Sequence, residues 1–241
     1  SVVAMAAGRP IGIALLSLRE DEGWVSGVGV IPAWRRQGVG RAIMLKLQET
    51  AREEGLTRLR LEVLHENRAG RRLYQQIGFT HYRDLLVLRM PSKPALPPPY
   101  ARLSLSPSRP QALLRHHGSF HRIDPSWQRA LPSLRKRADR IQGLGLWMDE
   151  ALVGYILYQA QPDVCHVLDL VVDPALSGAG DLARRMLLSL HGLYPELGGY
   201  VVNVPQEDPL LAAFTEIGYS VWHRQDEMVW PVRERFRPYE V

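Results

Sequence analysis

An internal repeat is the feature that most constrains the fold of this chain. The segment GRPIGIALL (residues 8–16) resembles EALVGYILY (150–158), and a series of glycines and prolines recurs first at a spacing of 142 positions (174 − 32) and then at 140 (218 − 78). The matched pairs are Gly12 and Gly154, Pro32 and Pro174, Gly38 and Gly178, Gly78 and Gly218, and Pro91 and Pro231. A repeat this long is a duplicated domain and not a solenoid unit.

The repeat divides the chain into two copies. We expect copy one to occupy residues 1–90 and copy two residues 101–241, joined by the proline-rich linker PSKPALPPPY at 91–100. Residues 101–143 have no counterpart in copy one, so we expect the first domain to lack its N-terminal elements in this chain. A length of 241 residues is enough for two small hydrophobic cores.

Copy one alternates between strand-like and helix-like patterns. Its apolar residues predict two helices, at about 39–54 and 67–77, each followed by a glycine that ends it. They also predict strands at about 2–7, 11–18, 24–31, 58–64 and 80–89. This order predicts an α/β (α+β) fold, with a mixed central sheet flanked by helices in each copy.

The composition indicates the cellular compartment and the classes of partner to expect. The only cysteine is Cys165, so no internal disulfide forms, and we expect a reducing, cytoplasmic compartment. No apolar run is long enough to span a membrane. The net charge of +5 permits polyanion binding, but the basic segment LRKRADR (134–140) is more typical of a solvated helix face than of a nucleic-acid site. We therefore expect no membrane and no nucleic-acid partner.

The stretch PAWRRQGVGRA (32–42) predicts an anion site. It joins the apolar strand that ends near Ile31 to a helix, and the helix start presents unpaired backbone N–H groups and a positive dipole end. Glycines there remove the β-carbons that would keep an anion at a distance, and three arginines add charge. The stretch lacks the Gly-Lys-Ser/Thr of a Walker loop and the third glycine of a dinucleotide fingerprint.

Two motifs together resemble one known family. Arg35-Arg36-Gln37-Gly38-Val39-Gly40 resembles the acetyl-coenzyme A signature Arg/Gln-x-x-Gly-x-Gly/Ala of the GNAT (general-control-related N-acetyltransferase) superfamily. The stretch LEVLHENRAGRRLYQQIGF (61–79) resembles the second motif of that family, a strand followed by an asparagine and, seven residues on, a tyrosine. The chain is thus identified as a tandem two-domain member, in which the C-terminal copy is degenerate.

The resemblance implies a binding site for acetyl-CoA as the cosubstrate, without a metal. Val28, Gly29 and Val30 would line the pantetheine arm and present a backbone amide to the thioester carbonyl. Asn67 would hydrogen-bond the same arm. The pyrophosphate would lie on the six residues from the corner, which are Arg36, Gln37, Gly38, Val39, Gly40 and Arg41, next to Arg35.

The resemblance also implies the catalytic groups. Tyr74 would protonate the departing thiolate, and Glu62 matches a glutamate that serves as general base in members that acetylate protein N-termini. This is coherent chemistry, because a protonated amine cannot attack a thioester until a base takes its proton, and the leaving sulfur needs an acid. Taken alone, Tyr74 is more typical of a core aromatic, and Glu62 is more typical of a solvated strand residue.

Copy two has lost the equivalent side chains. Phe214 stands at the position of Tyr74, Glu207 at that of Asn67 and Val202 at that of Glu62. Its corner, PALSGAG, carries no arginine, and Asp181 occupies the position of Arg41. An acid beside a phosphate is repelled, so we interpret copy two as a fold retained without its coenzyme site.

The predicted function is N-acetyl transfer from acetyl-CoA to an amine by direct attack. The acceptor is a small-molecule amine or a protein N-terminal amine, and the sequence indicates no oligomeric state. A non-catalytic acyl-CoA-binding or scaffolding protein is the alternative function.

Some single residues allow two interpretations. Arg71 and Arg72 either reach a coenzyme phosphate or form a solvated helix face. Trp24 and Trp34 either pack in the interior or line the acceptor pocket. The histidines at 116, 117 and 121 are close together in sequence, but we do not expect them to bind a metal, because no acidic or cysteine residue accompanies them.

Overall fold

The computed structural model describes residues 1–92 and 104–232, which form two compact units. Unit 1 comprises Ser1–Arg83 and Gln225–Val241, and unit 2 comprises Asp84–Arg224. Most of the predicted linker at 91–100 lies outside the described residues. Within the described part of the chain, none of the helices combines the length and the apolar character that a membrane-spanning helix needs.

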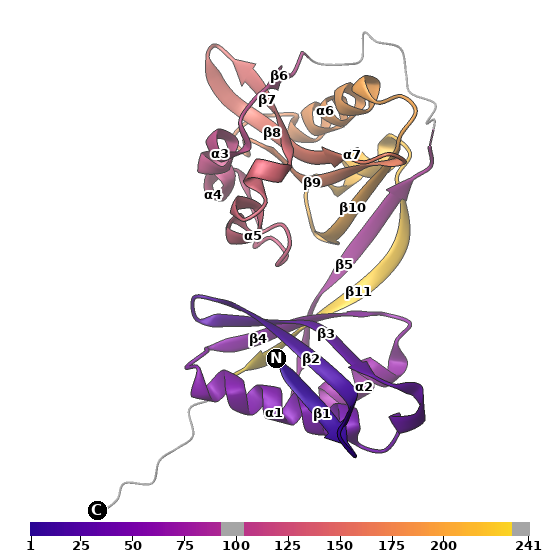
Figure 1. The fold of residues 1–241 in the computed structure, drawn as a ribbon. Coiled ribbons are helices and arrows are strands. Elements are labelled where there is room, and N and C mark those ends of the chain that lie inside the picture. Colours follow the sequence, from indigo (N-terminus) through magenta and orange to yellow (C-terminus); the bar gives the residue numbers. More distant parts are fainter. Residues whose placement is uncertain (93–103, 233–241) are drawn as a thin grey trace, which may run out of the picture. The chain divides into compact units, whose positions relative to one another are not determined.

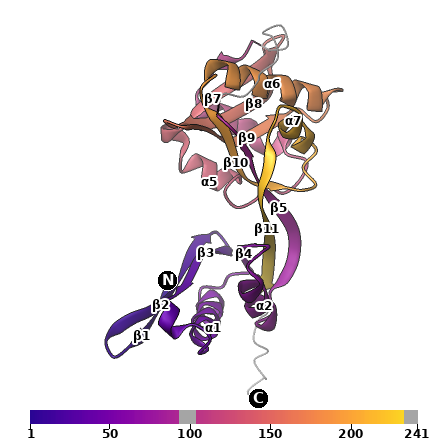
Figure 2. The same ribbon diagram turned by 90° about the vertical axis from the view of Figure 1, so that its right-hand side faces the viewer.

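Unit 1 is a sheet with two helices (Figures 1 and 2). Its strand order is β1-β2-β3-β4-β11, antiparallel except for the parallel pair β3–β4. The elements are β1 (Val2–Ala6), β2 (Arg9–Arg19), β3 (Glu22–Val30), the 3-10 turn η1 (Pro32–Trp34), α1 (Val39–Glu53), β4 (Arg58–Leu64), α2 (Arg68–Gln76), the start of β5 (Thr80–Met90) and the end of β11 (Ser220–Pro231). The predicted strands and helices of copy one are confirmed, with ends shifted by one or two residues.

Helix α1 forms the core of unit 1 by packing on one face of the sheet. Its side chains Met44 and Leu47 are fully buried and contact the alternating residues Leu59 and Leu61 of β4. Complete burial of a side chain such as Leu47 stabilises the fold by about 1.5–3 kcal/mol. Gly12 of β2 leaves room for α1, because a β-carbon there would lie 2.7 Å from Ile43 Cδ1 and 3.1 Å from Gly29 O.

Unit 2 repeats this plan with additional helices. Its strand order is β5-β10-β9-β8-β7-β6, in which the pair β9–β10 is parallel. The elements are β6 (Ser106–Pro107), α3 (Pro110–Leu113), η3 (Leu114–His116), α4 (His117–Phe120), α5 (Leu131–Arg135), η4 (Ala138–Arg140), β7 (Gln142–Met148), β8 (Ala151–Ala160), β9 (Val164–Val172), α6 (Ala179–Leu193), β10 (Gly198–Pro205) and α7 (Leu211–Glu216).

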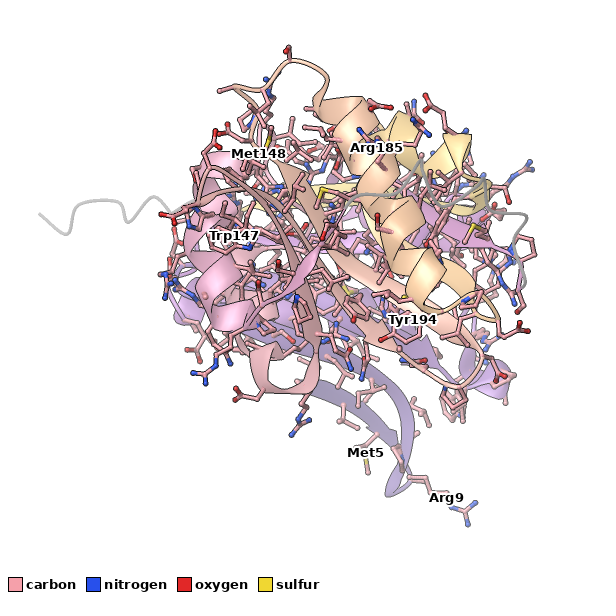
Figure 3. All side chains as sticks on the ribbon, turned by 90° about the horizontal axis from the view of Figure 1, so that it is seen from above. Met5, Arg9, Trp147, Met148, Arg185 and Tyr194 are labelled. Carbon is pink, nitrogen blue, oxygen red and sulfur yellow. The ribbon has the colours of Figure 1, made fainter. Side chains whose placement is uncertain are left out.

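Both faces of the unit 2 sheet are covered. The short helices α3 to α5 lie on one face of the sheet, and α6 and α7 lie on the other (Figures 1 and 2). Tyr155 and Leu157 of β8 belong to the core on the first face, whereas Ile156 and Tyr158 belong to the core on the second. Figure 3 shows Tyr194 at the C-terminal end of α6. The predicted mixed sheet flanked by helices is therefore confirmed for both copies.

The equivalent hairpins of the two copies end in exposed side chains. Figure 3 shows Met5 and Arg9 at the end of the β1–β2 hairpin, where Met5 is 57% exposed. In unit 2, Trp147 and Met148 are about half exposed where β7 turns into β8.

The boundary between the units differs from the one that the repeat predicts. It falls inside β5 and inside β11, the last strand of each copy, and not in the segment 91–100. The second half of β5 pairs with β10 and contributes Leu88 and Met90 to the core of unit 2. The second half of β11 pairs with β4 and contributes Met228 and Trp230 to the core of unit 1. Each copy thus supplies strand residues that complete the other unit, an exchange that sequence spacing does not reveal.

Candidate active site

Strands β3 and β4 separate at the centre of unit 1. Their parallel pairing runs only as far as Val25 and Leu61, although both strands continue beyond those residues. Ile31 N donates to Ile11 O at 3.0 Å, so the ladder alternation turns the peptide groups of Val28 and Val30 away from β2. Backbone donors and acceptors on this edge of β3 therefore face the region where the strands have parted.

A glycine-capped helix start follows β3. Gly38 adopts the left-handed conformation (φ 82°) at the N-cap of α1, and no side chain caps the first turn. A β-carbon added at Gly38 would meet no atom within 4 Å. The N–H groups of this first turn have no partner within the helix, and the dipole of a 15-residue helix makes its start positive. Geometry and charge here suit an anion.

Three arginines surround this helix start. The Nε of Arg35 donates to Val30 O at 3.0 Å, which ties the corner to the end of β3. Arg36 has a positive φ of 63°, an uncommon conformation for a residue with a β-carbon. Arg36 and Arg41 are exposed and have no acidic partner within the described ranges 1–92 and 104–232. Gln37 donates to Ala33 O at 2.9 Å and so closes the turn itself.

Asn67 is the N-cap of α2. Its Oδ1 accepts a hydrogen bond from Gly70 N at 3.0 Å, a capping role that the sequence motif did not indicate. Within the described parts of the chain, the Nδ2 amide of Asn67 makes no hydrogen bond. One end of the side chain therefore fixes the helix start, and the other end remains available as a donor.

Tyr74 lies on α2 and is half-buried at the edge of the unit 1 core. Its ring packs against Phe79 with the centroids 6.0 Å apart. Burial raises the pKa of the Tyr74 phenol above its usual value, so the hydroxyl keeps its proton at neutral pH. A protonated phenol next to a core is a suitable proton donor.

Glu62 lies on the opposite face of β4 from the core residues Leu61 and Val63. Its Oε2 accepts a hydrogen bond from Trp24 Nε1 at 3.2 Å across the β3–β4 pair. Trp24 thus orients the carboxylate at the last position before the strands separate. An aromatic face beside a carboxylate is also a common environment for an ammonium group.

Strand β11 brings two buried acids into unit 1 that sequence reasoning missed. The Nε of Arg71 donates to Asp226 Oδ2 at 2.6 Å, and His65 Nδ1 lies 2.9 Å from Asp226 Oδ1. The structure therefore assigns Arg71 to an ion pair, while Arg72 is exposed on the same helix.

Glu227, the second of these acids, is 1% exposed and holds two arginines. It contacts Arg60 Nη1 at 3.2 Å and Arg83 Nε at 2.6 Å. The sequence does carry a signal for both acids, because two adjacent acidic residues stand within an otherwise strand-like segment. An acid that is buried in such a strand needs a partner.

Unit 2 retains the backbone of the site with different side chains. The β9–β10 pairing ends at Val167 and Val201, the positions equivalent to Val25 and Leu61, and Gly178 caps α6 with φ 78°. Phe214 is buried against Tyr219, with the ring centroids 5.3 Å apart. Val202, Glu207 and Asp181 stand at the positions of Glu62, Asn67 and Arg41, and Asp181 is bonded to Arg184.

The structure brings together two of the three neighbouring histidines at positions 116, 117 and 121. Nitrogens of His117 and His121 and an oxygen of Asp169 all lie within 4.8 Å of one another. Both Asp169 oxygens also have protein partners, since Oδ1 contacts Arg129 Nη2 at 3.2 Å and Oδ2 contacts Tyr155 Oη at 3.0 Å. This cluster was missed because Asp169 sits in an apolar run, VCHVLDLVV, that reads as a plain core strand.

Comparison with known proteins identifies the first copy. Residues 1–79 match the acetyltransferase (GNAT) family. The ribosomal protein bS18-alanine N-acetyltransferase of Escherichia coli strain K12 is 33% identical over 72 residues, which are 30% of this chain and 49% of that protein. An aminoglycoside N(6′)-acetyltransferase type 1 of Stenotrophomonas maltophilia is 28% identical over 99 residues, or 37% of this chain and 65% of that protein. The chain spans about half the length of the first of these curated relatives.

The fold of the whole chain also has a solved counterpart. A tandem GNAT protein from the clavulanic acid biosynthesis pathway matches 97% of this chain and 82% of its own length, with a TM-score of 0.71 and 18% sequence identity. A GCN5-related N-acetyltransferase from Sphaerobacter thermophilus matches 94% of this chain with a TM-score of 0.67. Residues 1–79 are thus similar to the acetyltransferase (GNAT) family, and the chain as a whole has the fold of a tandem GNAT protein.

Proposed function

We propose that this protein transfers an acetyl group from acetyl-CoA to an amine and that unit 1 carries out the reaction. The observation that carries the proposal is the combination at one end of β3. A strand edge that has parted from β4 is followed by an uncapped helix start beside the exposed Arg36 and Arg41. An extended amide-bearing arm fits the first feature, and a pyrophosphate fits the second.

The side chains around this edge supply the chemistry of transfer. Glu62 takes a proton from the acceptor ammonium, and the freed amine attacks the thioester carbon. A carbon–nitrogen bond forms, the carbon–sulfur bond breaks, and Tyr74 gives its proton to the departing thiolate. The N–H of Val28 is the candidate donor to the developing oxyanion, and Asn67 Nδ2 holds the arm. No covalent enzyme intermediate is required.

Trp24 and Glu62 support an amine as the acceptor. The carboxylate attracts an ammonium, and the indole that orients it offers a cation–π face. The relatives named above act, by their names, on a ribosomal protein alanine and on an aminoglycoside, so both a protein N-terminus and a small-molecule amine remain candidate acceptors.

Coenzyme binding by paired glycine variants tests this proposal. Gly38→Glu places an anion at the helix start of unit 1, and Gly178→Glu places one at the equivalent start in unit 2. Both glycines have a left-handed φ, so the two variants carry similar backbone strain, about 1–2 kcal/mol. We expect calorimetric titration with acetyl-CoA to show one site per chain that is lost in Gly38→Glu and retained in Gly178→Glu.

Two results would count against it. Two equal acetyl-CoA sites per chain, or loss of binding only in Gly178→Glu, would move the coenzyme site to unit 2. Binding without amine-dependent release of free thiol, measured over a panel of amines and peptides, would instead favour a non-catalytic acyl-CoA-binding protein.

A further inference from the structure

Unit 2 contains a pocket of about 210 Å³ that has no part in the proposed reaction. Its walls are residues 120–123, the end of β9, the turn with Pro174 and Leu176, the first turn of α6 and residues 208–210, which precede α7. It lies where β9 and β10 have parted beyond Val167 and Val201. The ladder alternation, fixed by the bond from Asp173 N to Val153 O at 2.7 Å, turns the peptide groups of Leu170 and Val172 away from β8.

A histidine in this wall is positioned by a buried carboxylate. The side chain of His121 is 9% exposed, and its Nε2 lies 3.2 Å from Oδ2 of the fully buried Asp169. Asp169 is also held by Arg129 and Tyr155, and Arg129 is shared with Asp208. Within the described residues, the Nδ1 of His121 has no hydrogen-bond partner. The imidazole is thus fixed in orientation and keeps one nitrogen for a ligand.

The rest of the lining brings a helix start and an arginine, and the acid of that helix start, Asp181, is paired with Arg184. The α6 start contributes Ala179 and Gly180, and no side chain caps this helix. Arg122 donates to Pro174 O, which joins two walls and keeps its guanidinium at the rim. Asp208 is the one acid in the lining, and its carboxylate is occupied by Arg129 Nη1 at 3.3 Å and Leu210 N at 2.9 Å.

The size and the remaining walls limit the ligand. The other side chains of the lining are apolar and come chiefly from Phe120, Ile123, Leu170 and Leu210. A cavity of about 150 Å³ lined by such residues holds one benzene ring. The pocket therefore has room for one ring or a branched aliphatic group together with a small polar group.

We propose that this pocket is a second ligand site, which binds a small monocarboxylate with an apolar body. The carboxylate lies between His121 and the first turn of α6, and the apolar body contacts Leu170 and Phe120. Acetyl-CoA does not fit the same features, because the helix start of unit 2 lacks arginines and carries Asp181. The two units then bind two different molecules.

Calorimetric titration of the whole chain with benzoate tests the proposal, with benzyl alcohol as the neutral probe of the same ring. We expect one benzoate per chain, bound at least tenfold more tightly than benzyl alcohol. Gly180→Leu fills the pocket and should weaken benzoate binding at least tenfold, while the binding of acetyl-CoA should not change. Leucine is tolerated there, because a β-carbon at Gly180 meets no atom within 4 Å and the position is helical.

Gly40→Leu, at the equivalent position of unit 1, is the matched control. It should weaken the binding of acetyl-CoA and leave the binding of benzoate unchanged. His121→Gln should remove most of the preference for benzoate over benzyl alcohol. Absence of benzoate binding, equal affinity for the two probes, or loss of benzoate in Gly40→Leu but not in Gly180→Leu would each overturn the proposal. If His121→Gln does not fold, the two leucine variants and the two probes still decide it.

Discussion

Tyr74 shows how one side chain can serve both packing and chemistry. Its ring contacts Phe79 within the unit 1 core, while its hydroxyl makes no hydrogen bond among the described residues. Burial raises its pKa, so the proton is retained through the neutral range and is lost only at alkaline pH. The same burial that stabilises the fold therefore keeps the proposed acid in its active form.

Removal of this hydroxyl gives the first residue-scale prediction. Tyr74→Phe keeps the ring, so stability and acetyl-CoA affinity should change little, whereas turnover should fall by about 10²- to 10⁴-fold. Phe214→Tyr restores a hydroxyl in copy two without the other groups and should gain no activity. Steady-state thiol release with a confirmed acceptor, measured beside coenzyme affinity, checks both variants. Wild-type turnover in Tyr74→Phe would remove the tyrosine from the mechanism.

At this scale the sequence located residues that share a local motif. The corner around Gly38 and the helix that begins near Asn67 follow from neighbours in the chain, because turn and helix-start preferences are local, although the capping bond of Asn67 was not predicted. Asp226 and Asp169 could not be placed in this way. Each is buried by partners far away in sequence, and a single strand pattern does not say which charges will pack against it.

Helix α6 carries a pH-sensitive contact within the core of unit 2. His191 is fully buried, and its Nε2 lies 2.9 Å from the hydroxyl of Tyr219. Burial lowers the pKa of His191 to about 4. Burial, with a contribution from Arg137, also lowers the pKa of His166 on β9 to about 4. Both imidazoles are therefore neutral in the folded protein at pH values at which the unfolded chain already binds a proton.

The sign of the resulting pH dependence follows from linkage. The unfolded pKa is near 6.5, so the free energy of unfolding is unaffected above that value and falls as the pH drops from 6.5 towards 4. Each histidine accounts for a loss of roughly 3 kcal/mol across this window. We expect the free energy of unfolding of His191→Phe, measured in urea, to fall less steeply between pH 7 and 4.5 than that of the wild type. An unchanged slope in His191→Phe would show that His191 is protonated when folded.

Among the elements, periodicity predicted the helices and strands of unit 1 because their apolar faces repeat regularly. The helical segments between 110 and 140 are shorter and more broken than their composition indicates. Their apolar residues, such as Leu113, Phe120 and Leu134, serve to cover Tyr155 and Leu157 of the sheet, so tertiary packing and not helix length fixes their form.

For the molecule as a whole, the exchange of strands makes each unit depend on both copies. A fragment of residues 1–90 has no β11, so it lacks Met228 and Trp230 and leaves the edge of β4 unpaired. A fragment of residues 101–241 has no β5 and leaves an edge of β10 unpaired. The repeat itself gave no sign of this, because an exchanged strand keeps the same spacing in sequence as one that is not exchanged.

We therefore expect neither fragment to unfold cooperatively when it is produced alone. Deletion of a large core side chain costs about 2–5 kcal/mol, and each fragment loses at least two such side chains together. Thermal unfolding followed by circular dichroism should show a sloping signal for each fragment and a cooperative transition for an equimolar mixture of the two. A cooperative transition of 1–90 alone would mean that unit 1 does not need β11.

The exchange of strands also affects the order in which the two units can fold during synthesis. The ribosome synthesises most of unit 1 first, yet the strand that fills its core, β11, is made only after every helix of unit 2. Unit 2 receives its borrowed strand early, because β5 precedes every other element of that unit. The nascent chain should thus acquire its stable folded parts in the reverse of the order in which they are translated, with the proposed catalytic unit completed last.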